Sequence, residues 1–112
     1  MPDAELLPGT LDLLILKSVS LGPQHGYGIL LRIEQITGQA LKIEQGALYP
    51  ALYKLETRGE LNAEWGISEN NRRAKFYSLT PPGRKRLREG ISGWNRLTAA
   101  MAAALNATVE EL

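Results

Sequence analysis

The stretch from residue 45 to residue 79 constrains the fold most, because its hydrophobic period changes from that of a helix to that of a strand. Residues 45–59 carry leucines at helical spacing and end in a glycine, which can adopt a left-handed cap. Residues 61–67 and 74–79 alternate apolar and polar side chains on either side of the polar turn at 68–71. The sequence therefore predicts a helix followed directly by a hairpin.

The outer face of the predicted helix is polar and aromatic, since it carries Gln45, Tyr49, Tyr53 and Lys54. The returning arm of the hairpin is basic through Arg72, Arg73 and Lys75. A helix that can enter the major groove, followed by a basic hairpin that can grip phosphates, is the layout of a winged-helix DNA reader.

The rest of the chain is mostly helical, so we expect an α+β fold with few strands. The predicted elements are a helix from a Thr10 cap to about Ser20, a helix from about 25 to 38, a minimal strand at 41–43 and a last helix from a Thr80 cap to about Asn106. By length the chain is one compact unit. We divide it into a winged helix-turn-helix part, residues 1–79, and a C-terminal dimerisation helix, residues 80–112.

The last predicted helix carries an apolar stripe at intervals of three and four residues, as in a coiled coil. A helix of roughly 25 residues is too long to bury such a stripe on so small a core. The first helix is apolar on all sides, so one side can face the core of its own chain and another requires a second subunit. We therefore expect a homodimer, with an interface formed by Leu11, Ile15, Leu87, Ile91, Trp94, Leu97, Met101 and Leu105.

Charge and composition narrow the function further. The net charge is only +1, but the segment from Arg72 to Arg88 holds seven basic residues and no acidic one, which would attract a polyanion. For residues 84–88 the alternative is a solvated helix start. With no cysteine and one histidine, His25, the chain offers no metal site or nucleophile relay, so we expect neither an enzyme nor a cofactor. Without an apolar run of membrane length or a signal peptide, we expect a soluble cytoplasmic protein.

The candidate DNA contacts divide into base readers and phosphate binders. Gln45 can pair with an adenine edge, and Ala47 can touch a thymine methyl. The candidate phosphate binders are Tyr27, Tyr49, Tyr53, Lys54, Arg72, Arg73 and Lys75. The sequence leaves alternatives open: Tyr49 can pack on the second helix, Tyr53 at the core edge, and Lys75 can pair with Glu64 across the hairpin. Arg72 and Arg73 can simply keep the hairpin soluble, and we expect Trp65 in the core.

Nearly the whole chain resembles the PadR family of bacterial transcriptional regulators, in its smaller subfamily with a single C-terminal helix. The resemblance rests on the segments LLPGTLDLLIL, HGYGI, GALYPALYKLETRGEL and RRAKFYSLTPPGRKRL, and on Trp94. It implies a homodimeric repressor whose last helix packs against the first and last helices of the partner. Double-stranded DNA and a second copy are then the expected partners. The alternative is a winged-helix protein-interaction module that does not bind DNA.

The resemblance also implies a possible effector site at the dimer interface. In multidrug-sensing members, a tryptophan on the last helix lines a pore there and stacks on planar ligands, and Trp94 falls at the matching position. We expect Ile91 and Met101 beside it, and a small planar hydrophobic ligand. The flanking Gly90 and Gly93 are smaller than is usual in the family, so the resemblance does not determine the shape of the pocket.

Overall fold

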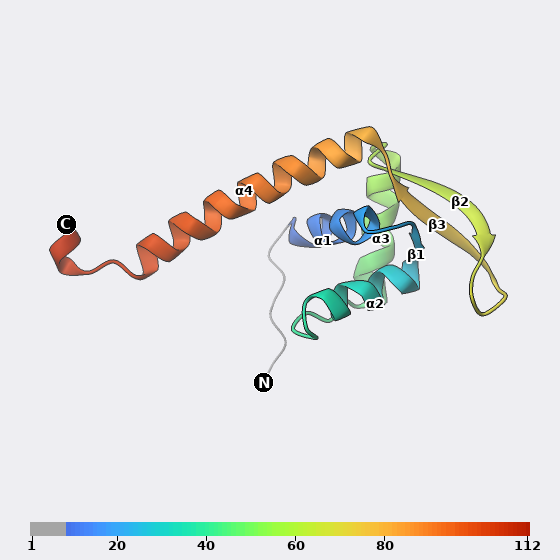
Figure 1. Ribbon diagram of the computed structural model, residues 1–112, viewed down its shortest axis with the longest axis horizontal. Helices are drawn as coiled ribbons and strands as arrows, with labels where there is room; N and C mark the ends of the chain where they lie inside the picture. The colour runs from blue at the N-terminus through green and yellow to red at the C-terminus, as the bar shows by residue number, and fades with distance from the viewer. Residues whose placement is uncertain (1–8) are drawn as a thin grey trace.

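The computed structural model describes residues 9–112 (Figure 1), so residues 1–8 of the expected N-terminal part lie outside the described residues. The order of elements confirms a mostly helical winged-helix fold with a long last helix. The elements are α1 (Thr10–Ser20), β1 (Gln24–His25), α2 (Gly26–Ile36), α3 (Gln45–Thr57), β2 (Leu61–Ile67), β3 (Arg73–Leu79), α4 (Pro81–Leu105) and the 3₁₀ helix η1 (Val109–Glu111).

The sheet is small and antiparallel, with β3 between β1 and β2. The predicted strand at 41–43 is wrong, because residues 41–44 adopt no regular structure. The third strand is β1, whose two residues pair with Tyr77 and Phe76 of β3. Such a short strand is defined by its pairing partner rather than by any local pattern. The hairpin of β2 and β3, residues 61–79, is the wing.

The core lies where α1, α2 and α3 meet, with β3 and the first turns of α4 against it. Two residues expected at the dimer interface belong to this core: Ile15 is 0% exposed and Leu87 is 8% exposed. Those two predictions are wrong, because the side chains of Ile15 on α1 and Leu87 on α4 pack within the chain and cannot reach a partner. On β3, Tyr77 is buried, whereas the neighbouring Phe76 is only partly buried.

The helix ends mostly follow the expected chemistry. Thr80 caps α4, since its Oγ1 accepts a hydrogen bond from the Gly83 amide at 3.0 Å. Gly59 has φ 76°, the left-handed conformation expected after α3. The start of α1 differs: Gly9, with φ 85°, is the cap, and Thr10 is the first residue of the helix. A glycine with positive φ thus takes the position predicted for the threonine.

The last helix extends well beyond the rest of the molecule (Figure 1). Its first turns pack on α1, where a Cβ at Gly90 would lie 2.7 Å from Leu13 Cδ1. The radius of gyration is 16.5 Å, against about 13 Å for a compact domain of this length. The excess reflects the second half of α4, which projects away from the core. No helix within residues 9–112 is long and apolar enough to cross a membrane.

Candidate nucleic-acid interface

A cleft of about 510 Å³ lies between the wing and the adjoining parts of α2 and α3. It collects predicted phosphate binders from three separate segments of the chain, namely Tyr27, Tyr49, Arg72, Arg73 and Lys75. His25 also lines the cleft. It caps α2, because its Nδ1 accepts a hydrogen bond from the Gly28 amide at 3.1 Å. No local pattern indicates that His25 lies at this place, because its position depends on the pairing of β1 with β3.

Tyr49 both packs within the chain and faces solvent. Its ring lies against Gly26, where an added Cβ would approach Cε1 to 2.7 Å, so only glycine fits there without displacing the ring. Tyr49 nevertheless stays about half exposed, and so does Tyr27 at the start of α2. Packing on α2 and contact with DNA are therefore compatible for Tyr49.

The N-terminal end of α3 is open to solvent. Gln45, Gly46 and Ala47 are all exposed, and an added Cβ at Gly46 would meet nothing within 4 Å. Tyr53, two turns further on, is 71% exposed, so the alternative of core-edge packing is wrong for it. One side of α3 thus presents polar and aromatic groups, while Leu48, Leu52 and Leu55 are buried on the other.

Lys54 faces α1 rather than the cleft. Its Nζ lies 2.7 Å from Asp12 Oδ2, and the Asp12 side chain is nearly buried. The ion pair supplies a counter-charge to a carboxylate that would otherwise be costly to bury. Much of the charge of Lys54 is therefore engaged within the chain, which makes it a weaker candidate for phosphate contact than the arginines of the wing.

Lys75 is also engaged, but within reach of the cleft. Its Nζ donates to Glu56 Oε1 at 2.8 Å and lies 5.7 Å from the centre of the Tyr77 ring. The alternative that Lys75 pairs with Glu64 is wrong, because the strand register sets Lys75 opposite Trp65 and Glu64 opposite Phe76. The hydrogen bond to Glu56 raises the pKa of Lys75, so the ammonium stays protonated at neutral pH.

Trp65 is the largest departure from expectation at this surface. It was expected in the core, yet it is 62% exposed. The wing extends past the core beyond Ala63, so no layer covers the outer part of this face. The Arg73 guanidinium lies 4.7 Å from the centre of the Trp65 ring instead, within the range of a cation–π contact. Trp65 and Arg73 are diagonal neighbours in the hairpin register, so they share a face.

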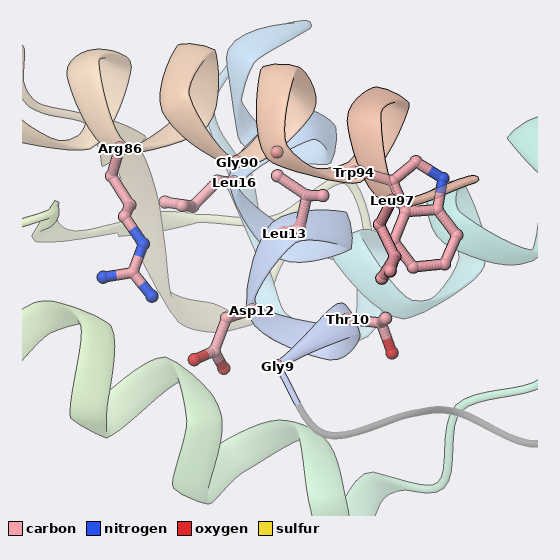
Figure 2. A pocket seen from close by; sticks show the side chains of 10 residues that line it. Gly9, Thr10, Asp12, Leu13, Leu16, Arg86, Gly90, Trp94 and Leu97 are labelled. Atoms are coloured by element: carbon pink, nitrogen blue, oxygen red, sulfur yellow. The ribbon is translucent and has the colours of Figure 1, made fainter. Parts of the chain in front are cut away.

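A second cavity, of about 330 Å³, lies between α1 and α4 (Figure 2). Trp94 and Leu97 line one end, Leu13 rises between the helices, and Asp12 and Arg86 lie at the other end. Neither of the other expected effector residues lines this cavity: Ile91, one turn before Trp94, lines a separate shallow depression on α4, and Met101 is two turns beyond Trp94. One chain alone therefore does not bring Trp94, Ile91 and Met101 into one cavity.

Sequence comparison places the chain among transcriptional regulators. A profile of the "Transcriptional regulator PadR-like family" matches residues 15–89. An uncharacterized protein from Lysinibacillus sphaericus is 27% identical over 94 residues, which cover 84% of this chain and 86% of that protein. An uncharacterized 37.1 kDa protein in a transposon of Streptomyces fradiae is 35% identical over 87 residues, which cover 78% of this chain but only 24% of that protein.

Solved structures agree. A transcriptional regulator from Clostridium thermocellum has a TM-score of 0.76 at 28% identity, over 84% of this chain and 91% of its own. A PadR family transcriptional regulator from Eggerthella lenta has a TM-score of 0.75 at 29% identity, over 89% and 85% of the two chains. The family consists of DNA-binding regulators, not enzymes, which favours DNA reading over a pure protein-interaction role. With the profile matching more than half of its length, the chain belongs to the PadR-like family of transcriptional regulators.

Proposed function

We propose that the protein acts as a homodimeric repressor that binds an inverted-repeat operator and is released by a small planar ligand. The observation that carries the proposal is the apolar stripe on α4, which stays exposed in one chain. Trp94 and Ile91 are each 39% exposed, and Leu97, Met101 and Leu105 are more exposed still. A contiguous apolar surface of this kind is characteristic of a protein interface.

Each chain would supply one complete reading surface. Gln45 and Ala47 lie at the end of α3 that would enter the major groove, so we assign them to the bases. Tyr27, Tyr49 and Tyr53 and the wing residues Arg72, Arg73 and Lys75 surround that end and would hold the phosphates. We keep Lys54 only as a minor contributor, because its ammonium is paired with Asp12.

Pairing through α4 would fix the distance between two reading surfaces. A symmetric dimer presents its recognition helices about one DNA turn apart, so its operator is an inverted repeat with half-site centres about 10–10.5 bp apart. Occupation of such a site near a promoter would exclude polymerase, and this is the repression that we propose. A ligand can release the dimer only if it binds more tightly to a state with a different spacing.

The cavity beside Trp94 is the place where we propose that this ligand binds. Its walls are mostly apolar, and the indole ring offers a flat surface for stacking. Trp65 also fluoresces, so the test uses a Trp65→Phe background, in which planar aromatic and planar cationic compounds are titrated against Trp94 emission. Saturable quenching that also lowers operator affinity would support the assignment. Absence of quenching across a broad panel would leave Trp94 with an interface role alone.

The proposal is tested by a gel-shift titration with the DNA upstream of the gene, repeated over a series of salt concentrations. We expect binding as a dimer, with an affinity that falls steeply with salt because neutralised phosphates release counterions. Size-exclusion chromatography with light scattering gives the mass of the free protein. A monomer at micromolar concentration, or binding that is indifferent to salt, would contradict the proposal. A reporter gene behind the same DNA distinguishes repression from activation.

A further inference from the structure

The cavity between α1 and α4 has two chemically different ends (Figure 2). Trp94 and Leu97 form an apolar end, with Leu13 in the middle of the cavity. Asp12 and Arg86 bring a carboxylate and a guanidinium to the opposite end. Stacking of a flat ring on Trp94 uses only the apolar part. The charged end is therefore free to recognise a further part of the ligand.

Arg86 has hydrogen-bond donors available for a ligand. Its Nη1 lies 3.9 Å from Glu60 Oε2, which is close enough for an ion pair but too long for a hydrogen bond. The Arg86 side chain is also about half exposed. A guanidinium presents five N–H donors in a planar fork that matches a carboxylate. Arg86 can therefore bind a carboxylate of a ligand and still remain close to Glu60.

Asp12 lines the cavity with a carboxylate that is already engaged by one cation. Its Oδ2 lies 2.7 Å from Lys54 Nζ on α3, and its side chain is only 10% exposed. A carboxylate has two oxygens with about four acceptor positions, so one ammonium does not saturate it. Asp12 can therefore accept a second cationic donor from the side of the cavity, against some repulsion between that donor and Lys54.

The size of the cavity limits the shape of the ligand. Its volume of about 330 Å³ lies at the small end of the usual range for ligand pockets, about 300–1,000 Å³. Arg86 and Trp94 are eight residues apart on α4, which is about 12 Å along the helix axis. At Gly93 an added Cβ would meet only Arg96 within 4 Å, at 3.8 Å, so the surface beside Trp94 is open. A ligand that reaches both ends is thus one aromatic ring system with a short chain that carries its charged groups.

We propose that this cavity binds an aromatic amino acid, or a compound of the same chemistry with an ammonium and a carboxylate on one short chain. The ring stacks on Trp94, the ammonium meets Asp12 and the carboxylate meets Arg86. A ligand with a single charge would face a like charge as well as an opposite one, whereas a zwitterion meets an opposite charge with each of its groups. The inference rests on the proposed ligand site and adds the charged part of the ligand.

The test compares four compounds that share one ring and differ only in their charged groups: L-tryptophan, tryptamine, indole-3-propionate and 3-ethylindole. Isothermal titration calorimetry on the whole chain without DNA, at neutral pH, gives the four dissociation constants. We expect each charged group to tighten binding by about tenfold, a modest gain for a charge-assisted hydrogen bond because Lys54 and Glu60 compete for the same side chains. L-Tryptophan should then bind about 100-fold more tightly than 3-ethylindole.

Variants assign the two charged groups of the ligand. Asp12→Asn should remove the advantage of the amine, so that L-tryptophan and indole-3-propionate bind alike. Arg86→Gln should remove the advantage of the carboxylate, so that L-tryptophan and tryptamine bind alike. Arg84→Gln is the matched control, because Arg84 is exposed on the same helix outside the cavity. It should leave the order of the four compounds unchanged.

A variant that gains affinity keeps the assignment testable if Asp12→Asn does not fold. Lys54→Met leaves the Asp12 carboxylate without its ammonium, so the amine of a ligand takes that place without a competitor. We expect L-tryptophan and tryptamine to bind this variant several-fold more tightly than the wild type and to raise its Tm by more. The two compounds without an amine should show no such gain.

The outcomes separate this inference from the proposed function. If the four compounds fail to bind while other planar compounds quench Trp94 emission, the inference is overturned and the ligand site stands. If the planar compounds also fail, the ligand site is overturned and the inference with it. Equal affinity for all four compounds, a preference for one sign of charge, or an order that survives both Asp12→Asn and Arg86→Gln would overturn the zwitterion alone. The expected order, with its loss in Arg86→Gln and its loss in Asp12→Asn or gain in Lys54→Met, would establish it.

Discussion

The DNA-facing surface and the exposed half of α4 differ in how far one chain completes them. Around the cleft, three side chains already have an internal contact that helps to fix their position: Tyr49 lies on Gly26, Lys75 on Glu56 and Arg73 on Trp65. Along the second half of α4, the apolar stripe is left exposed by the rest of residues 9–112 and faces solvent. The comparison indicates that reading DNA is a property of one chain, whereas the spacing of two readers requires a second copy.

The largest expected effect comes from charging the stripe. Leu97→Glu together with Met101→Glu would place four carboxylates in the apolar centre of the dimer, which leaves buried charges without partners. We expect monomers at micromolar concentration and a loss of operator affinity of at least about 100-fold, since one half-site must then bind alone. Light scattering and fluorescence anisotropy measure the two effects.

The control for that variant is Ala103→Glu, which adds a carboxylate on another side of the same exposed helix. It should remain dimeric. Circular dichroism should show both variants to be folded, because all three positions lie outside the core. If the Leu97→Glu, Met101→Glu protein were still dimeric, the exposed half of α4 would not be the dimer interface, and the contrast with the DNA-facing surface would be wrong.

The next largest effect is a change of sequence preference on replacing Gln45. A side-chain amide that pairs with one adenine contributes about 1–3 kcal/mol of discrimination at that base pair. Gln45→Ala should therefore relax the preference at one position per half-site and leave the others as they were. Measured against all single substitutions of the operator, an equal loss on every sequence would remove Gln45 as a base reader.

Replacing Arg73 should act on all sequences alike. Arg73→Ala is expected to weaken binding by roughly 1 kcal/mol and to reduce the salt slope by about one unit, as for a lost phosphate contact. Trp65→Leu should cost about 0.5–1 kcal/mol, the usual value of an exposed cation–π contact, by leaving the guanidinium less well oriented. In the Arg73→Ala background, Trp65→Leu should cause no further loss of DNA-binding free energy. An undiminished loss there would mean that Trp65 contacts DNA directly.

The smallest effect on DNA is expected at Lys54. Lys54→Met should leave operator affinity nearly unchanged, because the ammonium is engaged by Asp12. It should lower the free energy of unfolding by roughly 1–2 kcal/mol, since the nearly buried carboxylate loses its partner. Denaturant unfolding and anisotropy on the same sample check both statements. A loss of affinity comparable to that of Arg73→Ala would return Lys54 to the phosphate binders.

Local patterns were sufficient for the helices and the wing, because helical spacing, capping residues and strand alternation lie within short stretches of sequence. Local patterns did not predict that Trp65 is exposed. Alternation tells which side chains share a face of the wing, but whether anything covers that face depends on how far the wing extends past the core. The strand β1 was missed for a similar reason, since its two residues become a strand only through β3.

The partners of charged residues were also beyond the sequence. Lys54 and Lys75 look alike as basic residues near a predicted DNA surface, yet each meets a carboxylate brought near by the fold, Asp12 and Glu56. On α4 the stripe runs without a break from Leu87 to Leu105. Only the folded chain shows that Leu87, its first residue, is buried in the core and that the later residues stay exposed and available to a partner.

The most direct test of the account is a selection of bound sequences from a random DNA library by two proteins, the wild type and the Leu97→Glu, Met101→Glu variant. The wild type should enrich an inverted repeat with half-site centres about 10–10.5 bp apart. The variant should enrich the same half-site singly and weakly. The account holds that one chain suffices to read a half-site and that the dimer sets the spacing of two half-sites. It would be contradicted if the wild type enriched one unrepeated site, or if both proteins enriched the same repeat at the same spacing.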